Sequence, residues 1–156
     1  MASTMTSQFT SENGYMLLIE GLLDILKEIN GVGVTGEFIY MNFYQQGEQV
    51  GKELETENDP QTALKEFIEY IRAYFDIEII SESSTKNKYK SDIQFNNCFI
   101  KKLCKNQGLD FKNPLCRGTQ GFIEGVLSSM TGNKVRLDIH TPGWDICKGT
   151  IEFKKK

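Results

Sequence analysis

Residues 118–126 read GTQGFIEGV and combine two kinds of surface on one predicted helix. Glycines recur at spacings of three and four on one face, and larger apolar residues recur every four residues on another. The helix begins near Pro114 or Leu115 and reaches about Met130, where the turn TGN at 131–133 closes it. The glycine face holds Gly118, Gly121 and Gly125, and the apolar face holds Phe122, Val126 and Met130.

After this helix the spacing of the apolar residues changes from every third or fourth residue to every second residue, which predicts two strands. Residues 134–140 alternate between apolar and polar side chains, which is the pattern of a strand with one buried face. A turn at 141–144 then leads to a final strand over 146–153. The apolar positions of the first of these strands are Val135, Leu137 and Ile139.

An earlier pair of strands precedes the glycine-rich helix. Residues 77–79 and 93–95 alternate in the same way, and the polar segment 81–87 between them predicts a β-hairpin. Residues 96–114 are expected to form an irregular connection, with a short helical turn at 99–103.

Three further helices come first in the chain, over about 14–28, 35–56 and 59–74. The third has a clear start, because Asp59 is a good N-cap and Pro60 suits the first helical position. The first is apolar on more than one face, which predicts burial or a contact between subunits. Its main apolar stripe is Leu18, Leu22, Ile25 and Ile29.

Two glycines, Gly47 and Gly51, lie inside the second helix. Each costs a helix about 1 kcal/mol relative to alanine. They are tolerated where another element packs closely against the backbone, and a ligand resting in that groove is the alternative interpretation.

The order ααα-ββ-α-ββ predicts an α+β fold in which helices pack on an antiparallel sheet, as in ligand-binding domains. The 156 residues suit one domain, expected over 13–153. Residues 1–12 are polar and are expected to be disordered, and 154–156 form a basic tail.

Composition excludes several classes of function. The chain has 18 basic and 21 acidic residues, a net charge of −3, whereas nucleic-acid binders carry a basic excess. No apolar run approaches the roughly 20 residues of a membrane span. The first dozen residues lack the pattern of a secretory signal, so we expect a cytoplasmic protein. The four cysteines are then thiols or metal ligands rather than disulfides.

Motifs along the chain are similar to those of one known family. The second helix carries Tyr44-x-x-Gly47-x-x-x-Gly51-x-x-Leu54, and the glycine-rich helix carries Asn113-Pro114-Leu115-Cys116 followed by GFIEG at 121–125. The last hairpin carries Gly132-x-Lys134-Val135 and Cys147-x-x-x-Ile151-x-Phe153. In order and spacing, over residues 14–153, these motifs resemble the 4-vinyl reductase, or hydrocarbon-binding, domain family.

The resemblance implies a fold related to heme nitric-oxide-binding domains and to TRAPP trafficking subunits. It also implies a homodimer formed through the N-terminal helices, and a closed apolar pocket between helices and sheet. Relatives fused to transcription regulators sense phenols, and others accompany chlorophyll biosynthesis.

The same resemblance suggests a structural zinc ion. Sensor relatives hold zinc with cysteines that Cys116 and Cys147 match, but the strand between them has no cysteine. His140 could replace the missing thiolate, with Cys98, Cys104 or Asp138 as a fourth ligand. The alternative is that Cys116 and Cys147 are small buried apolar residues and His140 is a turn residue.

Aromatic residues are the candidates for the pocket lining. A ligand cavity is mostly apolar with a few placed polar groups, although any one of these rings could equally fill the core. Trp144 is the most telling, because a large ring in a Pro-Gly turn suits a pocket lid or a subunit contact. The predicted lining is Tyr40, Tyr44, Phe67, Tyr74, Phe95, Phe122 and Trp144.

The sequence thus predicts a homodimeric binding or sensor domain for a small hydrophobic or aromatic ligand rather than an enzyme. It would signal through a regulatory or enzyme partner protein. One alternative is an auxiliary subunit or small enzyme of tetrapyrrole vinyl reduction. A second is a TRAPP-like scaffold. No catalytic motif with a defined mechanism is found.

Overall fold

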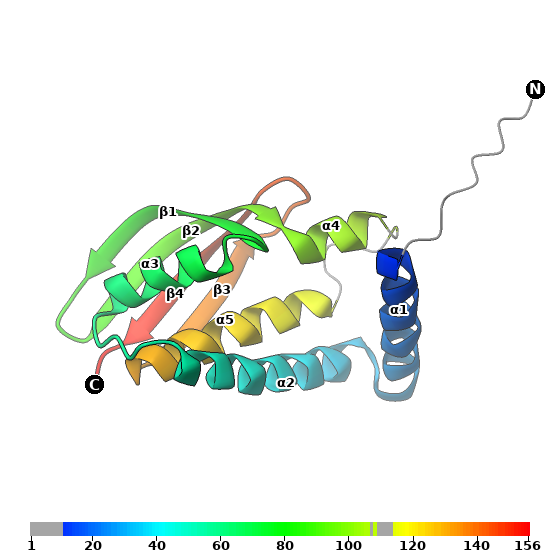
Figure 1. Ribbon diagram of the computed structural model, residues 1–156, viewed down its shortest axis with the longest axis horizontal. Coiled ribbons are helices and arrows are strands. Elements are labelled where there is room, and N and C mark those ends of the chain that lie inside the picture. Colours follow the sequence, from blue (N-terminus) through cyan, green and yellow to red (C-terminus); the bar gives the residue numbers. More distant parts are fainter. Residues whose placement is uncertain (1–10, 107, 109–113) are drawn as a thin grey trace, which may run out of the picture.

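The computed structural model describes residues 11–106, 108 and 114–156. Two long helices open it, α1 (Ser11–Asn30) and α2 (Val32–Glu53). They are joined by Gly31, whose φ of 78° is a left-handed backbone that other residues rarely adopt. In Figure 1, α1 stands across one end of α2. The predicted disordered segment 1–12 lies outside the described residues except for Ser11 and Glu12, which belong to α1.

Helix α3 (Pro60–Ile71) starts as the sequence predicts. The Asp59 carboxylate accepts hydrogen bonds from the backbone N–H and the hydroxyl of Thr62, both at 2.9 Å. These bonds, the backbone one first, lower the pKa of Asp59. The cap therefore satisfies a donor that the first turn would otherwise leave open.

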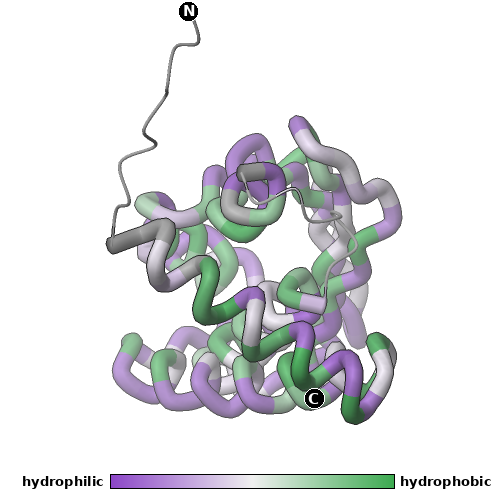
Figure 2. Tube along the Cα trace, turned by 90° about the vertical axis from the view of Figure 1, so that its right-hand side faces the viewer, coloured by the Kyte–Doolittle hydropathy of each residue, from purple (hydrophilic) through white to green (hydrophobic). Residues whose placement is uncertain are grey.

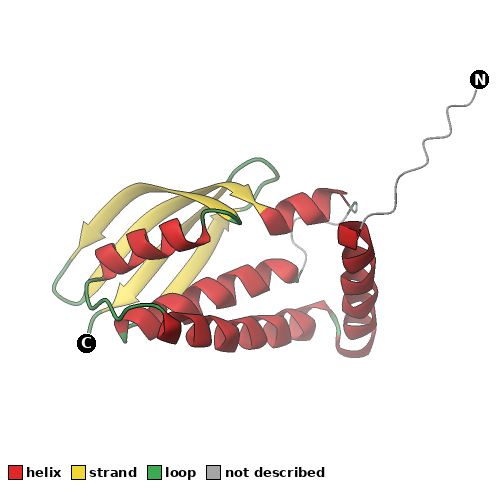
Figure 3. Cartoon of the chain, in the orientation of Figure 1, coloured by secondary structure: helices red, strands yellow, loops and turns green. Residues whose placement is uncertain are grey.

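The sheet has four antiparallel strands in the order β1-β2-β4-β3 (Figure 3). They are β1 (Phe75–Ser84), β2 (Lys88–Cys98), β3 (Lys134–Thr141) and β4 (Cys147–Lys154). The two predicted hairpins are present, and the pairing of β2 with β4 joins them into one sheet. The α+β class and the antiparallel sheet are confirmed.

The connection after β2 differs from the sequence expectation. In place of a short turn at 99–103, a helix α4 spans Phe99–Asn106. Ile100 and Cys104 lie four residues apart and are both buried, so this helix has one apolar stripe facing the protein. The element order is therefore ααα-ββ-αα-ββ within the described residues.

Helix α5 (Leu115–Thr131) lies between α2 and the sheet (Figure 1). Glycines allow its backbone to touch that of α2. A Cβ atom added at Gly51 would lie 2.6 Å from the Val126 carbonyl oxygen, and one added at Gly125 would overlap the Tyr44 carbonyl oxygen. The close helix packing predicted from Gly47 and Gly51 is therefore present, with α5 as the packing element.

The apolar core fills the space between α3, α5 and the inner face of the sheet. Strand alternation sends one set of side chains inward, as β2 shows with Tyr89, Ile93 and Phe95. The largest fully buried side chains include Phe67, Phe153, Leu64, Ile123, Leu127 and Leu137.

None of the described helices combines the length and the apolar character that a membrane crossing needs.

We expect Gly125→Ala to destabilise the fold by roughly 2 kcal/mol or more, because the new methyl group must push α5 away from the α2 backbone. The free energy of unfolding from urea titration measures this. Gly21→Ala is the matched control, since nothing lies within 4 Å of the added Cβ and alanine favours a helix. Equal effects at both positions would contradict the close packing of α2 against α5.

Candidate ligand cavity

A cavity of about 240 Å³ lies next to the apolar core, between α4, α5 and the sheet. We call it the inner cavity. Its walls are apolar side chains, thiols and a few polar groups. The apolar walls are Phe95, Leu137, Ile139 and Pro142, the thiols are Cys98, Cys116 and Cys147, and the polar groups are Lys101, Arg117, Thr119 and Gln120.

The local sequence explains why these residues meet. Phe95 near the end of β2 pairs with Cys147 at the start of β4, so their side chains lie on the same face. Leu137 and Ile139 alternate onto the inner face of β3. Cys116 and Thr119 are three residues apart in α5 and lie on neighbouring positions of one helix face.

Three thiols in and beside this cavity, those of Cys98, Cys104 and Cys116, are neutral at ordinary pH. Burial is the main reason that the pKa of Cys116 rises to about 12, and burial also raises the pKa of Cys98 and Cys104. A protonated thiol is a poor nucleophile and packs as a small apolar group. The arrangement therefore suits binding better than covalent catalysis.

Two polar groups of the inner cavity are buried with few hydrogen-bond partners among the described residues. Lys101 is only 5% exposed, and its Nζ donates to the Gly143 carbonyl oxygen at 2.5 Å. The Thr119 hydroxyl is buried, and within the described residues it has no hydrogen-bond partner. The Gly143 carbonyl also accepts a weak hydrogen bond from the Cys147 thiol at 3.5 Å.

A second, more polar hollow of about 740 Å³ lies between α2, α5 and the β3–β4 side of the sheet. We call it the outer groove. Arg117 and Gln120 line both the outer groove and the inner cavity, so this pair forms the partition between them. The charged and polar lining of the groove also includes Tyr40, Tyr44, Glu48, Glu124, Lys134, Arg136, Glu152 and Lys154.

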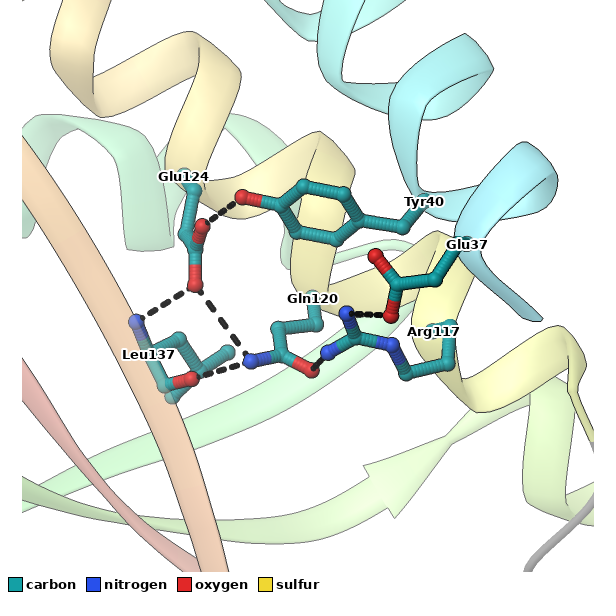
Figure 4. A network of polar contacts seen from close by, with 6 residues as sticks. All are labelled: Glu37, Tyr40, Arg117, Gln120, Glu124 and Leu137. Carbon is teal, nitrogen blue, oxygen red and sulfur yellow. Dashed lines mark hydrogen bonds and ion pairs between the residues drawn. The ribbon is translucent and has the colours of Figure 1, made fainter. Parts of the chain in front are cut away.

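The partition belongs to a connected polar network (Figure 4). Arg117 forms an ion pair with Glu37 of α2 at 2.6 Å and donates to the side-chain oxygen of Gln120. Its guanidinium also lies over the Tyr40 ring, 4.6 Å from the centroid. The network therefore ties the first turns of α5 to α2.

Glu124 is the centre of this network and is only 4% exposed. Its carboxylate accepts hydrogen bonds from the Tyr40 hydroxyl and from the Leu137 backbone N–H, the latter at 2.8 Å. Burial, and then the bond to Glu124, raises the pKa of Tyr40, so the phenol stays protonated. Gln120 donates to the Leu137 carbonyl oxygen at 2.5 Å.

Two of these contacts satisfy backbone hydrogen-bonding groups at the edge of the sheet. Strand β3 is an edge strand, and edge strands leave backbone N–H and C=O groups open. Glu124 and Gln120 of α5 satisfy both backbone groups of Leu137. Sequence reasoning missed this role, although a glutamate inside the apolar and glycine-rich run GFIEG was a usable signal.

The structure separates the seven aromatic residues predicted to line one pocket. Phe95 lines the inner cavity, whereas Tyr40 and Tyr44 line the outer groove. Phe67 is fully buried in the core and Phe122 packs against that core, while Tyr74 is 63% exposed. Trp144 is half-buried in the turn before β4, next to Gly143.

The structure also separates the predicted metal ligands. Cys116 and Cys147 line the inner cavity, together with Cys98, and Cys104 is buried nearby in α4. His140 and Asp138 are exposed and alternate onto the outer face of β3, away from these cysteines. Among the described residues, no three His, Cys, Asp or Glu side chains lie close enough together to hold a metal ion.

The arrangement of these residues therefore does not fit the zinc site that the resemblance implies, and Asn113 of the same motif lies outside the described residues. The zinc ion itself stays a prediction. Any metal site in this region would have to exclude His140, because the sheet separates its imidazole from Cys147.

We expect His140→Ala to keep the metal content and melting temperature of the wild type. The imidazole is exposed, and its hydrogen bond within the described residues is to the neighbouring Thr141 hydroxyl. Elemental analysis of tag-free protein and thermal unfolding measure both quantities. Cys147→Ala is the comparison, since it changes the inner cavity. Zinc lost from the His140 variant would contradict the placement of His140.

The sequence matches no protein-family model and no curated protein. The fold is similar to a solved structure described as the phenol-responsive sensory domain of the transcription activator PoxR with phenol. The similarity has a TM-score of 0.66 and covers 89% of this chain and 74% of that chain, at 10% sequence identity. At that identity the likeness establishes a shared fold.

Proposed function

We propose that this chain is a small-molecule binding domain that acts as a sensor, with its ligand in the inner cavity. The observation that carries the proposal is the cavity itself, walled by Phe95, Leu137, Ile139 and the neutral thiols of Cys98 and Cys116. An apolar hollow with a few placed polar groups is the usual form of a ligand site. Protein interiors otherwise pack with few voids larger than a water molecule.

The volume favours a ligand of about one ring. A cavity of 150 Å³ lined by apolar side chains is enough to bind benzene, and the inner cavity has about 240 Å³. The fold shared with a phenol-responsive sensory domain supports the same class of ligand. We also propose membership of the 4-vinyl reductase family, on the motifs given above, and a cytoplasmic location, which the four free cysteines support.

We further propose that two copies associate through α1 and the start of α2. Leu18 and Ile29 of α1 are 62% and 72% exposed, and they lie on one apolar stripe with Leu22 and Ile25, which are exposed as well. Contiguous exposed apolar surface of this kind marks an interaction site. In Figure 2, α1 crosses in front of the other elements and carries hydrophobic stretches along its length.

A second copy fits this surface because the apolar side continues onto α2. Val32, Val34, Phe38 and Met41 are also exposed, so exposed apolar side chains continue from α1 into the first half of α2. A twofold axis places the same patch on both partners and covers both. Ligand binding next to Arg117 would then be transmitted through its ion pair with Glu37, which lies on α2 close to that side.

The two alternative functions make different demands on the same features. A TRAPP-like scaffold would use the apolar side of α1 without any ligand. A subunit of tetrapyrrole vinyl reduction would need a much larger substrate than a cavity of about 240 Å³ holds. The proposed sensor role requires both the cavity and the apolar side.

Phenol should bind the wild-type chain and quench or shift the fluorescence of its single tryptophan, Trp144, which lies two residues after the cavity residue Pro142. Native mass spectrometry gives the stoichiometry. Ile139→Phe fills the cavity and should weaken binding at least about tenfold, a loss of about 1.4 kcal/mol. Ile79→Phe is the matched control, because Ile79 packs against the core away from the cavity lining. Equal weakening by both variants would place the ligand elsewhere.

The double variant Leu22→Glu/Ile25→Glu should convert a dimer into a folded monomer, because it buries two charges in the apolar contact. Light scattering coupled to size-exclusion chromatography measures the mass. Ile80→Glu is the control, since Ile80 is equally exposed but lies on β1. A wild type that is monomeric at all concentrations, or a double variant that stays dimeric, would refute the proposed interface.

A further inference from the structure

Lys101 occupies an unusual position for a lysine. It lies in the first turn of α4 and is 5% exposed, whereas its neighbour Lys102 on the same helix is exposed. Lysine side chains are almost never fully buried unless they are paired. In the described part of the chain, the pairing of Lys101 consists of one hydrogen bond from Nζ to the Gly143 carbonyl oxygen.

An ammonium group has three donors, so this single bond leaves most of its hydrogen-bonding capacity unused. Salt bridges are formed by other lysines and arginines of the described chain, but none by Lys101. Its side chain lines the inner cavity. The open donors therefore belong to a side chain that borders the space proposed for the ligand.

The same cavity supplies a second polar group that lacks a partner. The Thr119 hydroxyl is buried and lines the cavity from α5, and no described residue hydrogen-bonds to it. Buried polar groups in proteins nearly always have a partner, and each exception calls for an explanation. One acceptor group inside the cavity would satisfy both Thr119 and Lys101.

The charge balance of the lining indicates what kind of acceptor this is. The lining contains the cations Lys101 and Arg117 and no aspartate or glutamate among the described residues. Arg117 is already neutralised by Glu37 and bonded to Gln120. Among the described residues Lys101 has no counterion, and an anionic oxygen group on the ligand would supply one.

The apolar part of the lining determines the body of the ligand. Phe95, Leu137 and Ile139 offer an apolar surface that suits a ring rather than a second polar group. The volume of about 240 Å³ accommodates one ring with a small head group. A ligand with one apolar ring and one anionic oxygen group matches both the apolar and the polar part of the lining.

We infer that the inner cavity takes a small aromatic monocarboxylate, whose carboxylate accepts hydrogen bonds from Lys101 Nζ and the Thr119 hydroxyl while its ring packs on Phe95, Leu137 and Ile139. This inference rests on the proposed function and specifies the ligand class of the same cavity. It assigns to Lys101 a role in ligand recognition that its sequence context, KK at 101–102, does not suggest.

Isothermal titration of the full chain with benzoate, benzamide and phenol at pH 7 tests the inference. Benzamide has the shape of benzoate without the charge. Wild-type protein should bind benzoate at least about tenfold more tightly than benzamide, because hydrogen bonds to a charged group are the stronger ones. This comparison needs no variant, so it holds even if a substitution impairs folding.

Variants then identify the groups responsible. Lys101→Met, which keeps the length of the side chain, should abolish the preference for benzoate, and Thr119→Val should reduce benzoate affinity several-fold. Lys102→Met is the matched control and should bind as the wild type does. Circular dichroism confirms that each variant is folded.

The outcomes separate this inference from the proposed function. Binding of phenol with no preference for benzoate over benzamide would overturn the carboxylate inference and leave the proposed binding function standing. A benzoate preference that survives Lys101→Met would also overturn it. Failure of all three probes to bind would count against the proposed function as well.

Discussion

The contact between the backbones of α2 and α5 is the constraint on which the rest of the structure depends. Gly47 and Gly51 of α2 lie directly against the α5 backbone around Phe122 and Val126. Gly121 and Gly125 of α5 lie in the same way against the α2 backbone at Tyr40 and Tyr44. Because α5 also packs on the sheet, this contact fixes the distance between α2 and β3. The polar network can then span that distance with ordinary side chains, from Tyr40 to Glu124 and on to Leu137.

The position of α5 also separates the packed apolar core from the inner cavity. Its C-terminal half packs into the core with Val126, Leu127 and Met130. Its N-terminal half carries Cys116 and Thr119 into the inner cavity. Arg117 and Gln120 close the cavity toward the outer groove, so one helix contributes to the core, to the cavity wall and to the partition.

How well each feature of this structure can be predicted from the sequence depends on how far apart in the chain its interacting residues are. Helices and hairpins follow from local periodicity and caps, as Asp59 and Thr62 illustrate. The β2–β4 pairing joins residues far apart in sequence, and no local pattern specifies it. It places Cys147 opposite Phe95 in the cavity, whereas strand alternation places His140 on the opposite face. Lys101 could not be found from the sequence, because a lysine beside another lysine normally marks a solvated surface.

The central claim is that the inner cavity holds a small ring-bearing ligand. Methyl-selective NMR of isoleucine and leucine side chains during titration with benzoate or phenol tests it most directly. The account predicts large, saturable shifts for the methyl groups of Leu137 and Ile139, with little change at Ile68 on α3. Shifts confined to α1, or no saturable shift at Leu137 and Ile139, would contradict it.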